Sequence, residues 1–501
     1  MTMQRLLFLR IGIIGSLLGA TLTSLQAQNT PAAVSPGAGT TVPNPQKLGL
    51  QQSIDVALQN NLTIRQSQIQ LQGSELQLRQ SKLNRLPNVG GFASQNFSSG
   101  FNVNPVTNAF VERSILSNNF QLNSQVTLYN GMALQNTIRQ NDLLRQSNQQ
   151  ALGATQNNVI LTVVQNYLNV LTAQEQFVVA QRQAEVSRAQ LDRTQRLVNA
   201  GSVAESNLFD IRAQIANDEL AIVNAQNNID VAKVALLQAM NVPINGVVGT
   251  FEVEPIPVPD PAFDNYGATT QQVYETAQGF LPDVKAADLR VQSDALGVKV
   301  ARASLQPTLT LNAGVSTIYS NFGQQRRIAD GTTIQIPQTI VFNGVPQQIF
   351  LTQDGFRTED YTFTEQLRNN MNRSVALNLQ IPIYNRSQVR NRIINATLQQ
   401  QNSEVAAANA RLQLRQQIET AYTNLRAGAN RYRATQVQVE QLDLAFKAAE
   451  SRFNAGALNS TDYNIAKTNL DRARASLVQA KYDYVFRTKI LDFYQNKPLT
   501  F

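Results

Sequence analysis

The sequence predicts an α+β chain in which one unit of helices and strands is used twice. The Asn-Ala-Gly triplet at 199–201 recurs at 454–456, and the same offset of 255 residues maps Tyr129-Asn130 onto Tyr384-Asn385. Farther upstream the copies match at an offset of 220, so the second copy carries 35 extra residues. Within each copy, apolar residues recur first with helical spacing, then at every second position, then again with helical spacing.

The repeat sets the predicted boundaries. Residues 1–27 are expected to be a signal peptide and 28–50 a flexible leader, rich in Pro, Ala, Thr and Gly. Repeat 1 covers 51–247, a Pro-rich linker covers 248–270, and repeat 2 covers 271–498. Each repeat is predicted to hold a helix, a β-hairpin (87–129 and 307–384) and a long helical hairpin (131–240 and 386–495).

The N-terminal segment has the three parts of an export signal. Arg5 and Arg10 form a basic region, residues 11–25 are an apolar run, and Ala27 offers a small residue before a cleavage point. The alternative is a membrane anchor. An apolar core of 15 residues is shorter than the roughly 20 that a spanning helix needs, so we expect export.

The first helix and the long helices follow from spacing and from proline. Between Gln51 and Leu86 the apolar residues are spaced by threes, fours and sevens, and Pro87 ends the pattern. Residues 132–200 and 386–455 contain no proline and few glycines. At 1.5 Å per residue, each of these long runs is about 100 Å if it is one helix.

The β-hairpins follow from alternation. Apolar and polar side chains alternate over 120–128, 309–319 and 375–383, and a weaker alternation follows Pro87. The chain therefore holds four strands of about ten residues, each with one apolar face. The 35 extra residues fall in a long loop at 319–373, with expected turns at Asp330-Gly331 and Asn343-Gly344.

The returning helices carry a seven-residue repeat of apolar positions, which indicates coiled-coil packing. The alternative is an ordinary buried stripe. The positions are Leu208, Ile215, Ile222, Ile229 and Leu236 in the first copy, and Tyr463, Leu470, Leu477, Tyr484 and Leu491 in the second.

Gly201 and Gly456 are placed where each helical hairpin reverses, because glycine readily takes the left-handed conformation that ends a helix. Side chains soon after them are candidate caps for the returning helices. These are Ser202 and Ser206 in the first copy and Ser460 and Thr461 in the second.

The composition excludes most enzyme classes. The 501 residues include no Cys, His or Trp, which removes thiol nucleophiles, disulfides, His-based triads and His- or thiolate-bound metals. No phosphate-binding Gly-x-x-x-x-Gly-Lys motif is present. The formal charge of +8 is spread without a dense Lys/Arg run, so nucleic acid is not an expected partner. We expect no catalysis, cofactor or metal.

Four half-apolar strands form a sheet with two open edges, and a lipid environment does not tolerate open edges. Bacterial single-chain barrels have at least about eight strands. Other copies of the chain must therefore complete the sheet in a closed ring, with the polar faces lining a lumen.

The order of these elements, the Tyr-Asn boundaries at 129–130 and 384–385, the Asn-Ala-Gly reversals and the duplication resemble the TolC family of outer-membrane efflux proteins. The resemblance extends from about Gln51 to Pro498. It implies a homotrimer in which four strands per chain form a twelve-stranded transmembrane β-barrel in the outer membrane, continued by a periplasmic α-helical barrel with coiled-coil helix pairs. It also implies a passive exit duct of a tripartite efflux pump or a type I secretion system. The implied partners are a periplasmic adaptor, an inner-membrane pump and outer-membrane lipid.

The resemblance assigns two sets of site residues. Adaptor-contacting helix tips map to Asn199, Ala200, Gly201 and Ser202, and to Asn454, Ala455, Gly456, Ala457 and Leu458. Asp462 maps to an acidic ring that constricts the periplasmic aperture. The alternative for Asp462 is a carboxylate that the positive end of a helix dipole favours. The corresponding position in the first copy is Asn207, with Asp210 one turn later.

One function of another class stays open on the residues alone. An exported coiled-coil structural or adhesive protein, with the alternating segments as soluble hairpins, needs neither a membrane fraction nor a pore.

Overall fold

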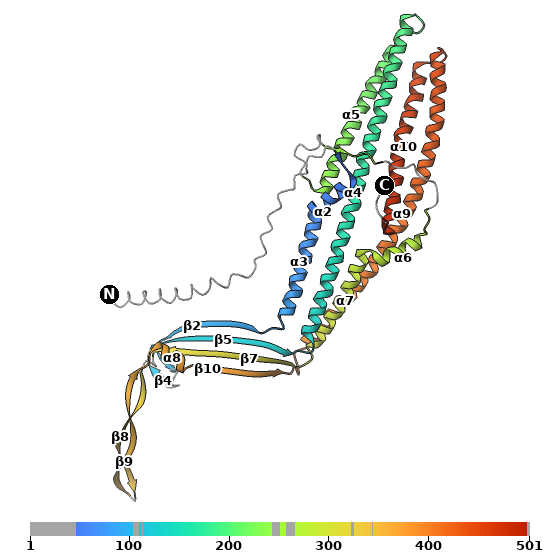
Figure 1. Ribbon diagram of the computed structural model, residues 1–501. Coiled ribbons are helices and arrows are strands. Elements are labelled where there is room, and N and C mark those ends of the chain that lie inside the picture. Colours follow the sequence, from blue (N-terminus) through green and yellow to red (C-terminus); the bar gives the residue numbers. More distant parts are fainter. Residues whose placement is uncertain are drawn as a thin grey trace, which may run out of the picture. The chain divides into compact units, whose positions relative to one another are not determined.

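The computed structural model describes residues 47–103, 110–112, 114–242, 251–256, 266–321, 325–342 and 344–497 (Figure 1). The signal peptide predicted at 1–27 and most of the predicted leader lie outside them. In chain order the elements are β1 (Lys47–Leu48), α2 (Leu50–Asn60), α3 (Leu62–Leu83), β2 (Asn88–Ser98), β3 (Phe101–Val103), β4 (Phe110–Glu112), β5 (Ile115–Tyr129), α4 (Ala133–Asn199), α5 (Ser206–Met240), β6 (Glu252–Val253), α6 (Thr270–Phe280), α7 (Pro282–Ala303), β7 (Thr308–Ser320), β8 (Gln325–Phe342), β9 (Val345–Asp360), α8 (Phe363–Asn369), β10 (Asn372–Gln380), α9 (Gln388–Asn454) and α10 (Ser460–Tyr494).

The described residues form two compact units. Unit 1 draws on 47–68, 152–281 and 413–497, and unit 2 on 69–151 and 282–412. The single helices α4 and α9 contribute residues to both units. No helix among the described ranges carries an apolar stretch long enough to cross a bilayer.

Unit 2 contains the predicted four-stranded sheet, antiparallel in the order β10-β7-β5-β2 (Figure 1). The register sorts its side chains onto two faces. Asn123, Gly314 and Ser374 share one row of the polar face, while Leu311 lies between Val126 and Leu377 in a row of the apolar face. Within this sheet, β2 and β10 are the outer strands, so each has one edge without a strand partner.

Helix α8 covers part of one sheet edge. Strand β7 continues beyond the Ser316–Asn372 pair at which β10 begins. The fully buried Gln366 accepts a hydrogen bond from the Ser320 amide at 3.0 Å, and Asn370 donates to the Ile318 carbonyl at 2.8 Å. Side chains of α8 and of its C-cap residue Asn370 thus hydrogen-bond to backbone groups of β7 beyond the end of β10.

The segment predicted as a long loop at 319–373 is folded. β8 and β9 form an antiparallel ribbon, followed by α8. Gly344, between the end of β8 and the start of β9, has the positive φ of 79° that tight hairpin turns favour. The turn expected at Asp330-Gly331 is wrong. Gly331 (φ 75°) instead lies at a register shift between Ala329 and Thr333, where the strand bulges and continues.

The helix predicted over 51–86 is two helices. α2 ends at Asn60, and the Asn61 side chain accepts a hydrogen bond from the Thr63 amide at 2.9 Å, so it caps α3. The second half has the same break, before Pro282 at the first position of α7. The paired elements have equal lengths: 11 residues in α2 and α6, 22 in α3 and α7, 67 in α4 and α9, and 35 in α5 and α10.

Two short strands correct the predicted leader and linker. Lys47 and Leu48 of β1, inside the predicted leader, pair in parallel with Glu252 and Val253 of β6, inside the predicted linker. The buried hydroxyl of Tyr167 donates to the Leu48 carbonyl at 3.2 Å and to the Glu254 carbonyl at 2.7 Å. Leu48 is 4% exposed and belongs to the unit 1 core, so burial of its side chain stabilises this short pairing.

Candidate functional site

The two helix tips of unit 1 share one backbone geometry. Gly201 (φ 71°) and Gly456 (φ 73°) are left-handed, as predicted. At the first tip the Ser202 amide donates to the Leu197 carbonyl, and at the second the Ala457 amide donates to the Arg452 carbonyl, each at 2.9 Å. Both helices therefore end in the motif in which glycine lets the chain reverse and closes the last carbonyls.

The predicted tip residues are mostly open to solvent. Asn199, Ala200, Gly201, Ser202, Ala455, Gly456 and Ala457 are exposed, and Asn454 and Leu458 are half-buried. No other described side chain lies close to an added Cβ at either glycine. The predicted caps are wrong. The N-cap positions are Glu205 and Asn459, because Ser206 and Ser460 are already the first residues of their helices.

Asp462 lies in the first turn of α10 and is exposed. Its amide donates to the Asn459 side chain at 2.7 Å, so Asn459 caps α10 and the Asp462 carboxylate does not serve as the N-cap. Its position near the positive end of the helix suits a carboxylate in either role proposed for it. Asp210 of α5 accepts a hydrogen bond from Ser460, which links the two hairpins close to the second tip.

An aromatic cluster lies just behind the second tip. Tyr463 stacks on Phe453, with ring centroids 4.9 Å apart, and lies 5.5 Å from Phe446. Tyr463 is 2% exposed, and its hydroxyl has no hydrogen-bond partner among the described residues. Burial raises the pKa of Tyr463 to about 12.

One turn further, a buried ionic cluster joins α10 to α5 and α4. Lys467 Nζ lies 3.1 Å from Asp218 Oδ2 and 2.9 Å from Asp471 Oδ2, with the Lys467 side chain 2% exposed. Ser187 donates to Asp218 at 2.5 Å, and Gln214 donates to its other oxygen at 2.8 Å. Burial raises the pKa of the Asp471 carboxyl, and its hydrogen bond to Lys467 opposes that shift. The apolar heptads of the sequence do not reveal this cluster, because Lys467 falls between the heptad positions Tyr463 and Leu470.

Unit 2 exposes two apolar stripes with seven-residue spacing. On α3 the stripe is Leu62, Ile69, Leu76 and Leu83, of which Leu62 belongs to unit 1; on α9 it is Leu398, Val405 and Leu412. All seven side chains are about half exposed or more. α3 leads into edge strand β2, and α9 follows edge strand β10, so each open sheet edge continues into one of these stripes.

Sequence reasoning read the α3 positions simply as the apolar face of a helix. The sequence nevertheless indicates their exposure, because the residues three positions after Leu62, Ile69 and Leu76 on the same helix face are Arg65, Gln72 and Arg79. A stripe of one apolar residue per seven is too narrow to bury a helix within its own chain. It does suit a contact with another helix.

The fold and these surfaces define a class: an amphipathic sheet joined to long helical hairpins, with unpaired surfaces at both sides. The family model for outer membrane efflux proteins matches residues 53–242 and 273–491. The chain therefore belongs to the outer membrane efflux protein family. The family membership gives an outer-membrane location, with the helical hairpins on the periplasmic side.

Named relatives agree with this assignment. The chain is 24% identical over 340 residues to the outer membrane protein TolC of Escherichia coli, which covers 66% of this chain and 59% of TolC. It is 25% identical over 299 residues to the pyoverdine export outer membrane protein OpmQ of Pseudomonas putida. This alignment covers 59% of the present chain and 53% of OpmQ. The aligned regions thus span little more than half of these relatives.

Solved structures share the fold. The outer membrane protein VceC of Vibrio cholerae superposes with a TM-score of 0.70 at 14% identity, covering 90% of this chain and 97% of VceC. The CmeC outer membrane channel of Campylobacter jejuni superposes with a TM-score of 0.64 at 17% identity, covering 90% of this chain and 87% of CmeC.

Proposed function

We propose that three copies of this chain form a passive exit duct through the outer membrane. Twelve strands, four from each copy, make the transmembrane barrel, and the long helices make a periplasmic tube. The duct serves a tripartite efflux pump or a type I secretion system. The observation that carries the proposal is the amphipathic four-stranded sheet, whose two open edges each lead into a helix with an exposed apolar stripe.

The two stripes support a ring of copies joined head to tail. The β2 edge and the α3 stripe lie at one side of the sheet, and the β10 edge and the α9 stripe at the other. A heterologous contact that repeats and closes gives a ring with no open edge. Closure satisfies the backbone groups of β2 and β10, which lipid requires. The equal lengths of the paired helices support a second, internal symmetry inherited from duplication.

The helix tips are the proposed contact with a periplasmic adaptor. Asn199 to Ser202 and Asn454 to Leu458 are small or polar and mostly exposed. Their glycine reversals leave the tips open to a partner that approaches the end of the hairpin.

Assembly is tested with one charged residue placed in each stripe. Leu76→Glu and Val405→Glu are expected to convert trimers into monomers in light scattering of the purified protein, and to abolish conductance in planar bilayers. The matched controls are Gln77→Glu and Ala406→Glu, exposed positions that directly follow the two stripe residues and lie about 100° away around each helix. If the wild-type protein is monomeric and forms no pore, the proposed duct is wrong. The result would instead favour an exported coiled-coil structural or adhesive protein.

The aperture role of Asp462 has its own test. If three Asp462 carboxylates line the aperture, Asp462→Ala raises single-channel conductance and weakens block by divalent cations. Asp462→Asn separates charge from size. Unchanged conductance and block in both variants would leave only the helix-dipole role for this residue.

A further inference from the structure

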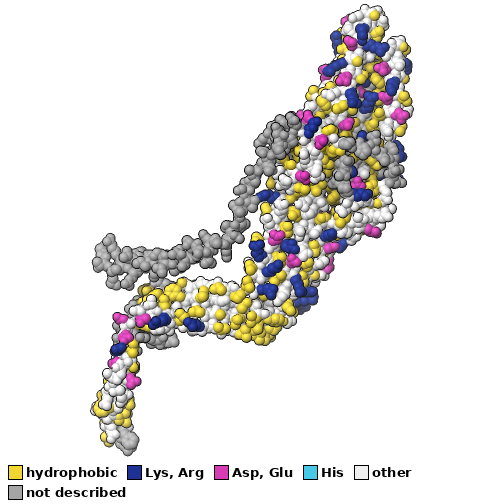
Figure 2. Space-filling view, viewed as in Figure 1, with side chains coloured by type: hydrophobic (Ala, Val, Ile, Leu, Met, Phe, Trp, Pro, Cys, Tyr) yellow, Lys and Arg dark blue, Asp and Glu magenta, His cyan; other side chains and the backbone are white. Residues whose placement is uncertain are grey.

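Lys and Arg side chains gather where the helices of unit 2 meet the sheet (Figure 2). Residues 76–86, 130–141, 295–306 and 384–403 flank the ends of the four strands and contain no Asp or Glu. They contain nine cations, which we call the basic belt: Arg79, Lys82, Arg85, Arg139, Lys299, Arg302, Arg386, Arg390 and Arg392.

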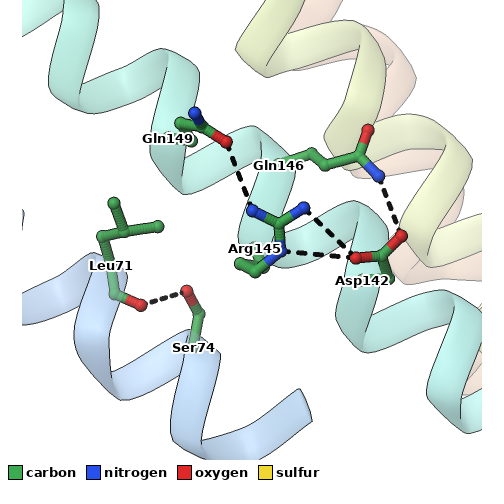
Figure 3. Close-up of polar contacts among 6 residues, drawn as sticks. All are labelled: Leu71, Ser74, Asp142, Arg145, Gln146 and Gln149. Atoms are coloured by element: carbon green, nitrogen blue, oxygen red, sulfur yellow. Dashed lines mark hydrogen bonds and ion pairs between the residues drawn. The ribbon is translucent and has the colours of Figure 1, made fainter.

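The belt differs from the neighbouring charges of the same unit. All nine side chains are exposed, and none forms an ion pair with a described residue; Arg392 donates only to the Ser304 hydroxyl. Farther along the same helices, Arg411 pairs with Asp288. Arg145 binds Asp142 at 3.3 Å and Gln149 at 3.2 Å (Figure 3), and Arg290 binds Asp294 at 3.3 Å. The absence of Asp and Glu therefore distinguishes the segments of the belt from the adjoining parts of the same helices.

The belt adjoins the apolar end of the sheet. Exposed Leu86, Tyr129, Ile383 and Tyr384 lie next to it in the chain, and Ile383 is 95% exposed. Tyrosines between an apolar band and a polar zone are typical of a membrane–water interface. Because the helices lie on the periplasmic side, this interface is that of the inner leaflet of the outer membrane.

Assembly of the proposed ring brings the unpaired cations of neighbouring copies close together. The proposed ring sets the α3 side of one copy against the α9 side of the next, so Arg79, Lys82 and Arg85 approach Arg386 and Arg390 of the neighbour with no carboxylate between them. Like charges at such a junction repel unless an anion lies among them. The belt lies where lipid phosphates lie, and guanidinium groups match phosphate oxygens well.

We infer that the basic belt binds the phosphate headgroups of anionic phospholipids in the periplasmic leaflet. This inference rests on the proposed membrane-spanning trimer. The bound lipids neutralise the junctions between copies, so binding depends on lipid charge and is weakened by salt.

The test measures lipid retained by the purified full-length trimer. The protein in detergent is titrated with phosphatidylglycerol or phosphatidylcholine, and bound lipid is counted by native mass spectrometry at low and high salt. Wild type is expected to retain phosphatidylglycerol preferentially at low salt. The triple variant R79Q/K82Q/R85Q is expected to bind it at least about five-fold more weakly, the effect of one cation near an anionic surface, with phosphatidylcholine unchanged.

The control triple R182Q/R193Q/R212Q removes three exposed arginines from the helices of unit 1 and is expected to bind like wild type. R386Q/R390Q provides a second belt variant if the first does not assemble. Equal retention of both lipids by wild type, or unchanged preference in trimeric belt variants, overturns the inference. So does a belt variant that loses only anion selectivity in conductance, because its cations then face the lumen. A wild type without trimers rejects the proposed function instead.

Discussion

Replacing Lys467 with methionine tests whether the buried cluster holds α5 and α10 together. Methionine keeps most of the volume of the lysine side chain but removes its charge. The Asp218 carboxylate, 8% exposed, then loses the cation at 3.1 Å, and Asp471 loses the one at 2.9 Å. Two carboxylates then remain close together without the cation that both contact.

The expected cost follows from this burial. Breaking a buried ion pair by removing one partner costs about 3–5 kcal/mol, because an uncompensated charge stays in a low-dielectric site. Ser187 and Gln214 still donate to Asp218, so the carboxylate is not fully orphaned and the lower end of that range is expected. The exposed pair of Arg188 in α4 and Glu219 in α5, at 3.1 Å, is the control, and Arg188→Met is expected to cost about 1 kcal/mol or less.

Hydrogen exchange of the purified protein measures the effect locally. In Lys467→Met, amides of α5 around Asp218 and of α10 around Asp471 are expected to exchange about a hundred-fold faster, which corresponds to about 3 kcal/mol. The double variant Lys467→Met/Asp218→Asn is expected to recover much of this protection, because an amide carries no charge, its oxygen can still accept from Gln214, and its NH2 group can donate to the Ser187 hydroxyl. Unchanged exchange in the single variant, or no recovery in the double, would refute the reasoning.

Three further predictions concern single groups. Tyr463→Phe removes a buried hydroxyl without a partner among the described residues, so thermal stability is expected to rise by about 1 kcal/mol, and a loss would show that the hydroxyl is satisfied. Burial raises the pKa of Tyr463 and Tyr482 to about 12, against about 10 in an unfolded chain, so their contribution is intact below pH 10 and is lost as pH rises through 12. Helical circular dichroism is expected to fall in that window, and less steeply in the double Phe variant. Gln366→Met leaves the buried Ser320 amide without its acceptor and is expected to cost about 1–3 kcal/mol in thermal unfolding, whereas the exposed Gln347→Met is expected to have no effect.

The sequence was most informative where one physical rule acts alone. Alternation predicted the two faces of the sheet, and proline-free spacing predicted α4 and α9 to within one or two residues at each end. The break at Asn61 between α2 and α3 was not predicted, because the apolar spacing continues across it. The break depends on a local hydrogen bond, in which the Asn61 side chain caps α3. Strands β1 and β6 escaped because each is two residues long and exists only through pairing with a distant partner.

The functional surfaces were predicted unevenly for a related reason. The glycine reversals of the tips depend on local conformation, so Gly201 and Gly456 could be located from spacing alone. The Lys467 cluster and the cover of β7 by Gln366 depend on which helix or strand lies alongside, and no local pattern carries that information. The missing acids of the basic belt are visible in the sequence, but only the fold brings those four segments to one level.

The equal lengths of α4 and α9 constrain how this protein can change by insertion and deletion. One added residue in α4 would turn every later side chain by about 100° and would move its tip by about 1.5 Å relative to the tip of α9. Seven added residues restore the facing of the seam but still leave the two tips unequal. Length changes in the long helices must therefore occur in both halves together and in multiples of the heptad. The ribbon of β8 and β9 lies outside these constraints, so its length can change without moving either helix tip.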